Sequence, residues 1–172
     1  MKKTDKKTTA KYILTAITIA WCIMIFALSA VRSTQSNSVT VKDAGILSTI
    51  FVKDYDMKTI REQIDITAWV HHLLRKAAHF AEFAILGFLL TADIYLWFSP
   101  RKPLLFISAL VSGTVYAASD EIHQYFVPGR SCEFKDVVID AAGVAGGVIF
   151  AFILMYIASR ISAGKQKKQA NE

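Results

Sequence analysis

A run of 20 residues without a charged side chain, from Tyr12 to Val31, is the feature that most limits how this chain can fold. A helix needs about 20 mostly apolar residues to cross the hydrocarbon of a bilayer, and a soluble core does not need such a run. Three further apolar stretches follow, at about 77–98, 104–119 and 137–159. We therefore expect an all-α protein, an integral membrane four-helix bundle with spans at about 12–31, 77–98, 104–119 and 137–159.

Composition and charge agree with a membrane setting. Hydrophobic residues make up 53% of the 172 residues, and the formal net charge is +6. A basic chain can bind nucleic acid, but here the lysines flank apolar runs, where basic residues set membrane topology. We expect the lipid bilayer as the partner and no nucleic acid.

The segments outside the spans divide the chain into an arm, a membrane domain and a tail. Residues 1–11 carry five lysines and one acid and form a basic arm, residues 12–159 form the membrane domain, and residues 160–172 form a basic tail. Residues 32–74 are predicted as a polar-to-mixed loop. Its later half, from Met57, places Ile60, Ile64 and Thr67 on one face of an amphipathic segment, which we expect to lie against the bilayer surface.

Basic residues also predict the orientation of the spans. The arm, the pair Arg101-Lys102 and the tail fall on one side of the membrane when there are four spans, so both termini should be cytoplasmic. The loop before the second span, with seven basic residues and five acids over residues 32–76, fits the outside. Ala27-Leu28-Ser29 faintly resembles a signal-cleavage site, but the apolar run exceeds the ~7–15 residues of a signal core, so we expect an uncleaved anchor, with cleavage as the alternative.

Polar residues from three spans should meet near the outer membrane face. Arg75, His79 and Glu82 share one helix face at spacings of four and three. Ionisable groups at membrane depth are unfavourable unless they pair or serve a function, which makes each a candidate for a functional site. The full set of candidates is Arg75, Lys76, His79, Glu82, Asp120, Glu121, His123, Gln124, Arg130, Asp136 and Asp140.

Three motifs in this order resemble the VanZ-like family. They are Arg75-Lys76-x-x-His79-Phe80-x-Glu82-Phe83, then Asp120-Glu121-x-x-Gln124-x-Phe126-Val127-Pro128-Gly129-Arg130, then Asp136-Val137-x-x-Asp140-x-x-Gly143-x-x-x-Gly147, and the likeness covers about Trp21 to Ile157. Two positions depart from it: Phe83 stands where tyrosine is expected, and Asp140 stands where asparagine is common. The resemblance implies a small multi-pass protein of the bacterial cytoplasmic membrane and cell envelope. The namesake of the family is associated with resistance to teicoplanin, a glycopeptide antibiotic.

The first hypothesis for function is an envelope enzyme, a hydrolase or group transferase that acts at the outer leaflet on a lipid-linked or peptidoglycan-related substrate. Glu121 or Asp120 would be the general acid or base, and His79 with Glu82 a proton-transfer pair. Arg75 and Arg130 would bind a phosphate or carboxylate. The remaining substrate-binding candidates are Lys76, His123, Gln124, Asp136 and Asp140.

The second hypothesis is a non-enzymatic binder of a lipid headgroup, a cell-wall precursor or a glycopeptide. The third is a transporter or a partner subunit, although four spans are few for transport unless the chain forms an oligomer. The sequence identifies no cofactor, and a metal site at His79, Glu82, Asp120 and Glu121 lacks any ligand signature such as His-Glu-x-x-His. Structural interpretations stand beside these hypotheses: Arg75-Lys76 as an interfacial anchor, and His79 with Glu82 as a hydrogen-bonded pair between helices.

Overall fold

The computed structural model describes residues 3–31, 36–127 and 133–169, which form five α-helices and one 3-10 helix. In chain order these are α1 (Lys3–Val31), α2 (Ser36–Phe51), η1 (Tyr55–Met57), α3 (Ile60–Phe98), α4 (Lys102–Tyr125) and α5 (Phe134–Gln169). By length and apolar content α1, α3, α4 and α5 can each cross a bilayer. The expected all-α membrane protein with four spans is confirmed.

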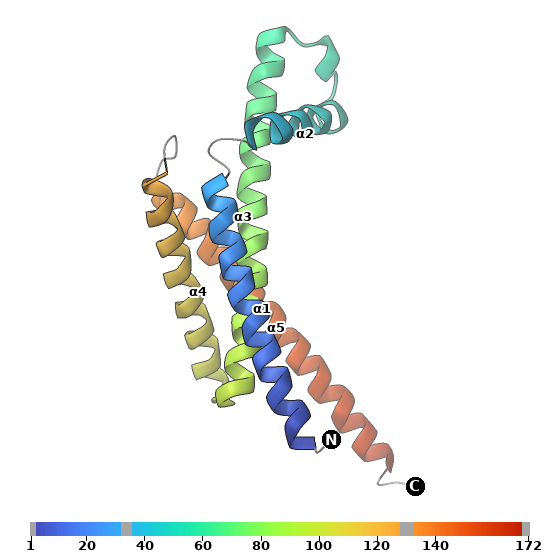
Figure 1. Cartoon of the computed structure of the whole chain (residues 1–172). Helices are drawn as coiled ribbons and strands as arrows, with labels where there is room; N and C mark the ends of the chain where they lie inside the picture. Colours follow the sequence, from blue (N-terminus) through green and yellow to red (C-terminus); the bar gives the residue numbers. More distant parts are fainter. Residues whose placement is uncertain (1–2, 32–35, 128–132, 170–172) are drawn as a thin grey trace.

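The four long helices run alongside one another, and α3 lies at the centre of the bundle (Figure 1). It packs most extensively against α5 and also contacts α1, α2 and α4. Both termini lie at one end, which we call the terminal end. At the opposite end α3 continues beyond the other helices, and we call this the projecting end. The buried core consists of Ile25, Phe83, Leu86, Ala109, Ala117, Val144 and Val148.

Glycines let α3 and α5 pack with their backbones close together. A Cβ added at Gly147 would clash with the backbone carbonyl oxygen of Ala84, and one at Gly143 with that of Phe80. On the facing helix, a Cβ at Gly87 would clash with the carbonyl oxygen of Val144. In lipid no hydrophobic effect drives helices together, so close backbone packing at small residues supplies much of the attraction. This seam fixes the polar residues that α3 and α5 carry above it.

The segment expected to lie flat on the membrane instead extends the second span. Residues 60–98 form one helix, which begins at the N-cap Thr59 with a capping box to Glu62. Neither proline nor glycine occurs between Ile60 and Leu86, so nothing in the sequence breaks the helix. At 1.5 Å per residue, 39 residues span about 58 Å, against a hydrocarbon thickness of about 30 Å. The N-terminal part of α3 projects beyond the other long helices (Figure 1).

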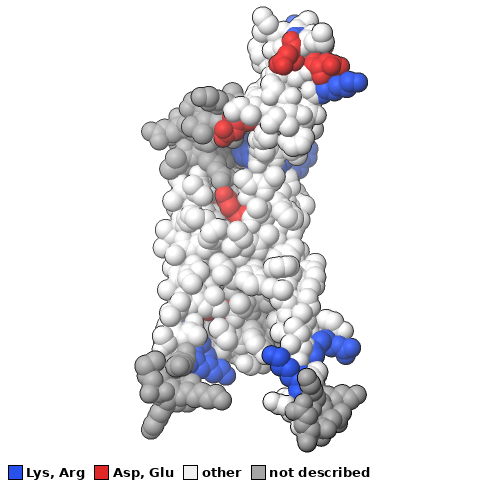
Figure 2. All heavy atoms as spheres, turned by 90° about the vertical axis from the view of Figure 1, so that its right-hand side faces the viewer, with Lys and Arg blue, Asp and Glu red and all other residues white. Residues whose placement is uncertain are grey.

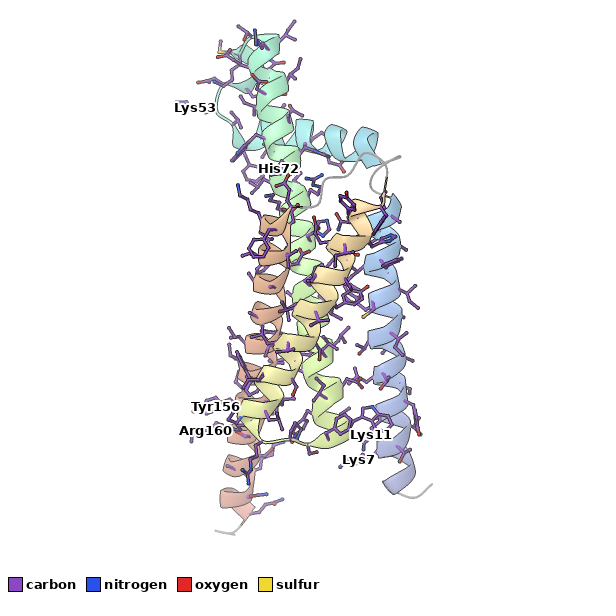
Figure 3. All side chains as sticks on the ribbon, turned by 90° about the vertical axis from the view of Figure 1, so that its left-hand side faces the viewer. Lys7, Lys11, Lys53, His72, Tyr156 and Arg160 are labelled. Carbon is purple, nitrogen blue, oxygen red and sulfur yellow. The ribbon has the colours of Figure 1, made fainter. Side chains whose placement is uncertain are left out.

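The loop prediction is also wrong for residues 36–51, which form α2. This helix lies across the long axis of the bundle and packs against α3 (Figures 1 and 3). Ala44 and Ser48, one turn apart, are fully buried, whereas Ile46, Ile50 and Phe51 are exposed. Small residues on one face of α2 therefore allow it to pack closely against α3. The mixture of polar and apolar residues in this segment did not indicate such a face.

Charged side chains lie mainly at the two ends of the bundle. Lys7, Lys11 and Arg160 lie at the terminal end, whereas Lys53 and His72 lie at the projecting end (Figure 3). Most of the face between the ends carries no charged side chain, as Figure 2 shows. Aromatic rings accompany the terminal-end cations, because Lys11 lies over Trp97 and Arg160 over Tyr156. Such a belt is typical of a membrane–water interface.

Candidate functional site at the projecting end

Basic residues of α3 face acidic residues of α5 at the projecting end. The Lys76 Nζ atom lies 3.3 Å from Oδ1 of Asp136. One turn deeper, Nδ1 of His79 lies 3.9 Å from Oδ1 of Asp140. The spacings predicted from the sequence, three to four residues on each helix, produce this pairing in two layers. The glycine seam below holds the two helices close enough for both pairs to form.

A small cavity lies within this pairing. Its volume is about 10 Å³, and it is lined by Arg75, Lys76, His79, Asp136, Ile139 and Asp140. A cavity of this size holds about one water molecule. The cavity therefore has room for a water or a single ligand atom group, and a larger ligand would have to remain at its rim.

Asp140 is buried without the hydrogen bonds that a carboxylate normally accepts. Only 1% of the residue is exposed, and neither carboxylate oxygen accepts a hydrogen bond within the described part of the chain. Oδ1 of Asp120 is also buried and accepts no hydrogen bond from the described residues. An acceptor that is buried and unused destabilises the fold by about 1–3 kcal/mol. Two such acceptors at one end of the bundle call for an explanation other than packing.

The rest of the Asp120 carboxylate belongs to a network between α1 and α4. Its Oδ2 atom accepts hydrogen bonds from Ser29 Oγ at 2.8 Å and from Gln124 Nε2 at 2.9 Å. All three residues are buried. Gln124 was a candidate from the sequence, whereas Ser29 was not. The network holds one oxygen of Asp120 in a fixed direction and leaves the other available.

Glu121 is buried as well, although it lies about a quarter turn from Asp120 on the helix. Its Oε1 atom accepts a hydrogen bond of 2.8 Å from the backbone N–H of Glu133, just before α5 begins. The residue is only 2% exposed. The segment just before α5 therefore contacts this buried acid. Arg130, the remaining candidate, lies outside the described residues.

The ring of His123 stacks on Phe26 of α1, with ring centroids 3.8 Å apart and planes 24° from parallel. Its Nε2 atom is buried and forms no hydrogen bond with any residue in the described ranges. Phe26 and Ser29 are one helical turn apart on α1, so the first span contributes a wall to the site. The sequence contained a signal for this wall, since Phe26-x-x-Ser29 places a polar residue and a ring together inside an otherwise apolar span.

Carboxylates of α3, α4 and α5 gather around Asp140. Glu82, Asp120, Glu121 and Asp136 all lie close enough to act on its charge. Trp21 of α1 anchors the α3 member of this group by donating a hydrogen bond of 3.0 Å from Nε1 to the backbone carbonyl of Glu82. The structure thus brings together the described candidates from three segments far apart in the sequence. Among the described residues no three histidine, cysteine or acidic side chains are grouped closely enough to hold a metal ion.

A comparison with protein families matches the part of the chain that contains these residues. The family model described as VanZ/LLP1 matches residues 14–156, which is most of the 172-residue chain. The chain belongs to the VanZ/LLP1 family. The matched part of this VanZ/LLP1 member contains every candidate residue named above, together with Phe26 and Ser29. No curated protein and no solved structure matches the chain.

Proposed function

We propose that this VanZ/LLP1 member acts at the outer face of the bacterial cytoplasmic membrane on a lipid-linked or peptidoglycan-related ligand. One observation carries the proposal: Asp120 and Asp140 keep buried carboxylate oxygens that accept no hydrogen bond from any described residue, and Asp140 also lines a small cavity. Ionisable groups inside a membrane bundle mark sites of function, because selection would otherwise replace them with apolar residues.

The distribution of basic residues supports an outward-facing site. Lys7, Lys11 and Arg160 lie at the terminal end, opposite the cluster (Figure 3). Lys and Arg are enriched in cytoplasmic segments, so both termini are assigned to the cytoplasm and the cluster to the outer leaflet. Figure 2 shows basic side chains without acidic ones at the terminal end, and acidic together with basic side chains at the projecting end. A ligand would reach the cluster from outside the cell or from the outer leaflet.

In the enzymatic form of the proposal, the buried acids and His79 move protons during hydrolysis or group transfer. Glu121 or Asp120 accepts a proton from an attacking water or hydroxyl group, and His79, coupled to Glu82, donates one to the leaving group. Arg75 and Lys76 at the rim bind a phosphate or carboxylate of the substrate. The cavity lined by His79 and Asp140 has space for about one water molecule.

The size of that cavity favours a second candidate function. With about 10 Å³ of space, it does not admit a reacting group larger than water. A protein that only binds would need no more than this, because the headgroup of a lipid, a cell-wall precursor or a glycopeptide such as teicoplanin would rest at the rim on Arg75 and Lys76. Holding a precursor or the antibiotic there would change the sensitivity of the cell to teicoplanin.

Two substitutions distinguish the two candidates. Glu121→Gln keeps an acceptor for the Glu133 N–H, and His79→Asn keeps a polar side chain, so both variants should fold. Lipids and cell-wall precursors would be quantified by mass spectrometry in cells that carry the wild type, either variant or no protein. An enzyme predicts a substrate pool that accumulates in the variants although the purified variants still bind it. If the protein only binds its ligand, no strain should contain a converted product. The effect of each variant on the cell should then decrease in proportion to its affinity for the ligand.

Asp93→Asn, at the opposite end of the bundle, provides the matched control. It changes a membrane-helix carboxylate in the same conservative way but lies far from the cluster, so the pools and teicoplanin sensitivity should equal those of the wild type. Identical pools in all strains, combined with a purified protein that retains no envelope lipid, precursor or glycopeptide, would contradict both candidate functions.

A further inference from the structure

An apolar groove lies on the same pair of helices that forms the polar cavity. Its volume is about 390 Å³, within the range of small-molecule sites. The lining side chains include Phe80, Ala84, Ile85 and Phe88 of α3, with Gly146 and Phe150 of α5. All of them are apolar, and none belongs to the buried core. The groove therefore offers a surface for hydrocarbon and not for a polar ligand.

Small residues create this groove and aromatic rings bound it. A Cβ added at Gly146 would meet only the Cζ atom of Phe80, at 3.5 Å, so the space above this glycine is open. The rings of Phe88 and Phe150 lie with centroids 6.0 Å apart at the other end. Phe80, Ile85 and Phe150 are exposed, which shows that no described part of the chain covers the groove. It opens sideways toward lipid.

The groove lies on the same two helices as the small cavity and further toward the terminal end. Phe80 follows His79, which lines the cavity, and Gly146 lies six residues after Asp140, or about 9 Å along the helix. From Arg75 to Phe88 the seam extends about 20 Å, slightly more than the ~15 Å that one leaflet contributes to the hydrocarbon. A hydrocarbon chain that starts at the cavity rim and reaches Phe88 would thus extend to about the middle of the bilayer.

Charge along the seam indicates which end of a lipid belongs where. Arg75 forms no ion pair within the described part of the chain, so its guanidinium can bind a phosphate with two parallel hydrogen bonds. Lys76 adds a second positive charge, partly balanced by Asp136. Asp136 and Asp140 would repel an anion that moved deeper. A phosphate therefore stays at the rim, and a hydroxyl or amine beside it can donate to Asp140.

We infer that the α3–α5 seam binds a lipid phosphate from the outer leaflet, with its phosphate on Arg75 and Lys76 and its hydrocarbon chain in the groove from Phe80 to Phe150. This inference rests on the proposed outward orientation and narrows the proposed ligand to a phosphate lipid. Phospholipids and polyprenyl phosphates share this chemistry. The lipid binds sideways from the bilayer, so no opening between the helices is needed.

Photo-crosslinking of the full chain in nanodiscs tests the inference. The probe is phosphatidylglycerol with a diazirine in the acyl chain, and labelled peptides are identified by mass spectrometry. We expect labels concentrated on 80–88 and 146–150. Gly146→Leu fills the groove and should lower labelling by more than about tenfold, and Arg75→Gln should lower it about tenfold, the loss of one charge-assisted hydrogen bond. A diacylglycerol with the same diazirine should respond to Gly146→Leu but not to Arg75→Gln.

Ala142→Leu is the matched control, since Ala142 is an exposed position of α5 that does not line the groove. Its labelling should equal that of the wild type, and equal labelling in Gly146→Leu would overturn the inference. Labels spread evenly over all four helices, or a seam covered by a second copy of the chain, would overturn it too. Competition by unlabelled polyprenyl phosphate or phosphatidylglycerol identifies the source of the lipid.

This readout is independent of turnover. If the seam is labelled as expected but the envelope pools never change, the lipid site stands and the proposed function fails. If the envelope pools change but labelling is the same in Gly146→Leu as in the wild type, the proposed function stands and the lipid site fails.

Discussion

Two acids in membrane helices, Asp93 at the terminal end and Asp140 at the projecting end, show how differently the ends of this bundle treat a carboxylate. Oδ1 of Asp93 accepts a hydrogen bond of 2.7 Å from Thr15 Oγ1, and Trp97 Nε1 donates to the same hydroxyl at 2.9 Å. Asp140 is 1% exposed and accepts no hydrogen bond within the described ranges. Asp93 joins α1 to α3. Asp140 has oxygen atoms that could accept hydrogen bonds but accept none from the described residues.

The difference separates structural from functional use of polar groups. A hydrogen bond between membrane helices stabilises a bundle by about 0.6 kcal/mol on average, and up to about 2 kcal/mol. The Thr15–Asp93 link belongs to this class. At the projecting end Asp140 is buried with four other acidic residues near enough to act on it electrostatically, an arrangement that opposes folding. We interpret the polar residues at the terminal end as contacts that hold the helices together, and those at the projecting end as a site for a ligand.

The largest expected effect concerns the seam on which the projecting end depends. Gly147→Leu would drive a side chain into the backbone of Ala84 and Phe88, which cannot move aside without separating α3 from α5. We expect a loss of about 3 kcal/mol, the upper part of the range for overpacking, measured as thermal unfolding in detergent. Gly164→Leu is the control, because nothing lies within 4 Å of its added Cβ. Equal stability of the two variants would show that the helices do not pack this closely.

Ser29→Ala should have the next largest effect. It removes the donor to Asp120 Oδ2 and leaves that buried carboxylate with Gln124 as its described donor. We expect a loss of about 1–2 kcal/mol in the same unfolding measurement. Ser119→Ala on α4 is the control, since the exposed Ser119 bonds only to the carbonyl of its own helical turn. If both variants unfold like the wild type, the α1–α4 network does not form.

Thr15→Val should lower the free energy of unfolding by less, about 1 kcal/mol. The terminal end is partly exposed, so water can replace the lost hydrogen bonds to Asp93 and Trp97. Ile19→Val, an exposed position on the same helix, gives the control for a small change of volume. A variant as stable as this control would argue that these contacts at the terminal end do not hold the helices together.

The sequence predicted the spans and the convergence of acids, because hydrophobic runs and helical spacing depend on the chain alone. It predicted the position of Glu121 on the helix but not its burial or its hydrogen bond to the backbone of Glu133, which depend on how distant segments pack. Ser29 and Phe26 were missed for the same reason: a partner on another helix depends on rotation and tilt, which periodicity does not encode. The helix α2 was missed because its buried face is made of small residues, Ala44 and Ser48.

The most direct test of the central claim is the unfolding temperature of Asp140→Asn in detergent. This substitution keeps size and shape but removes an ionisable carboxyl group that lies near four other acidic residues. If the projecting end is kept for a ligand and not for folding, the variant should unfold at the temperature of the wild type or higher, by about 2–4 °C for each kcal/mol gained. A fall as large as that of Thr15→Val would show that Asp140 fastens helices as Asp93 does, and would contradict the account.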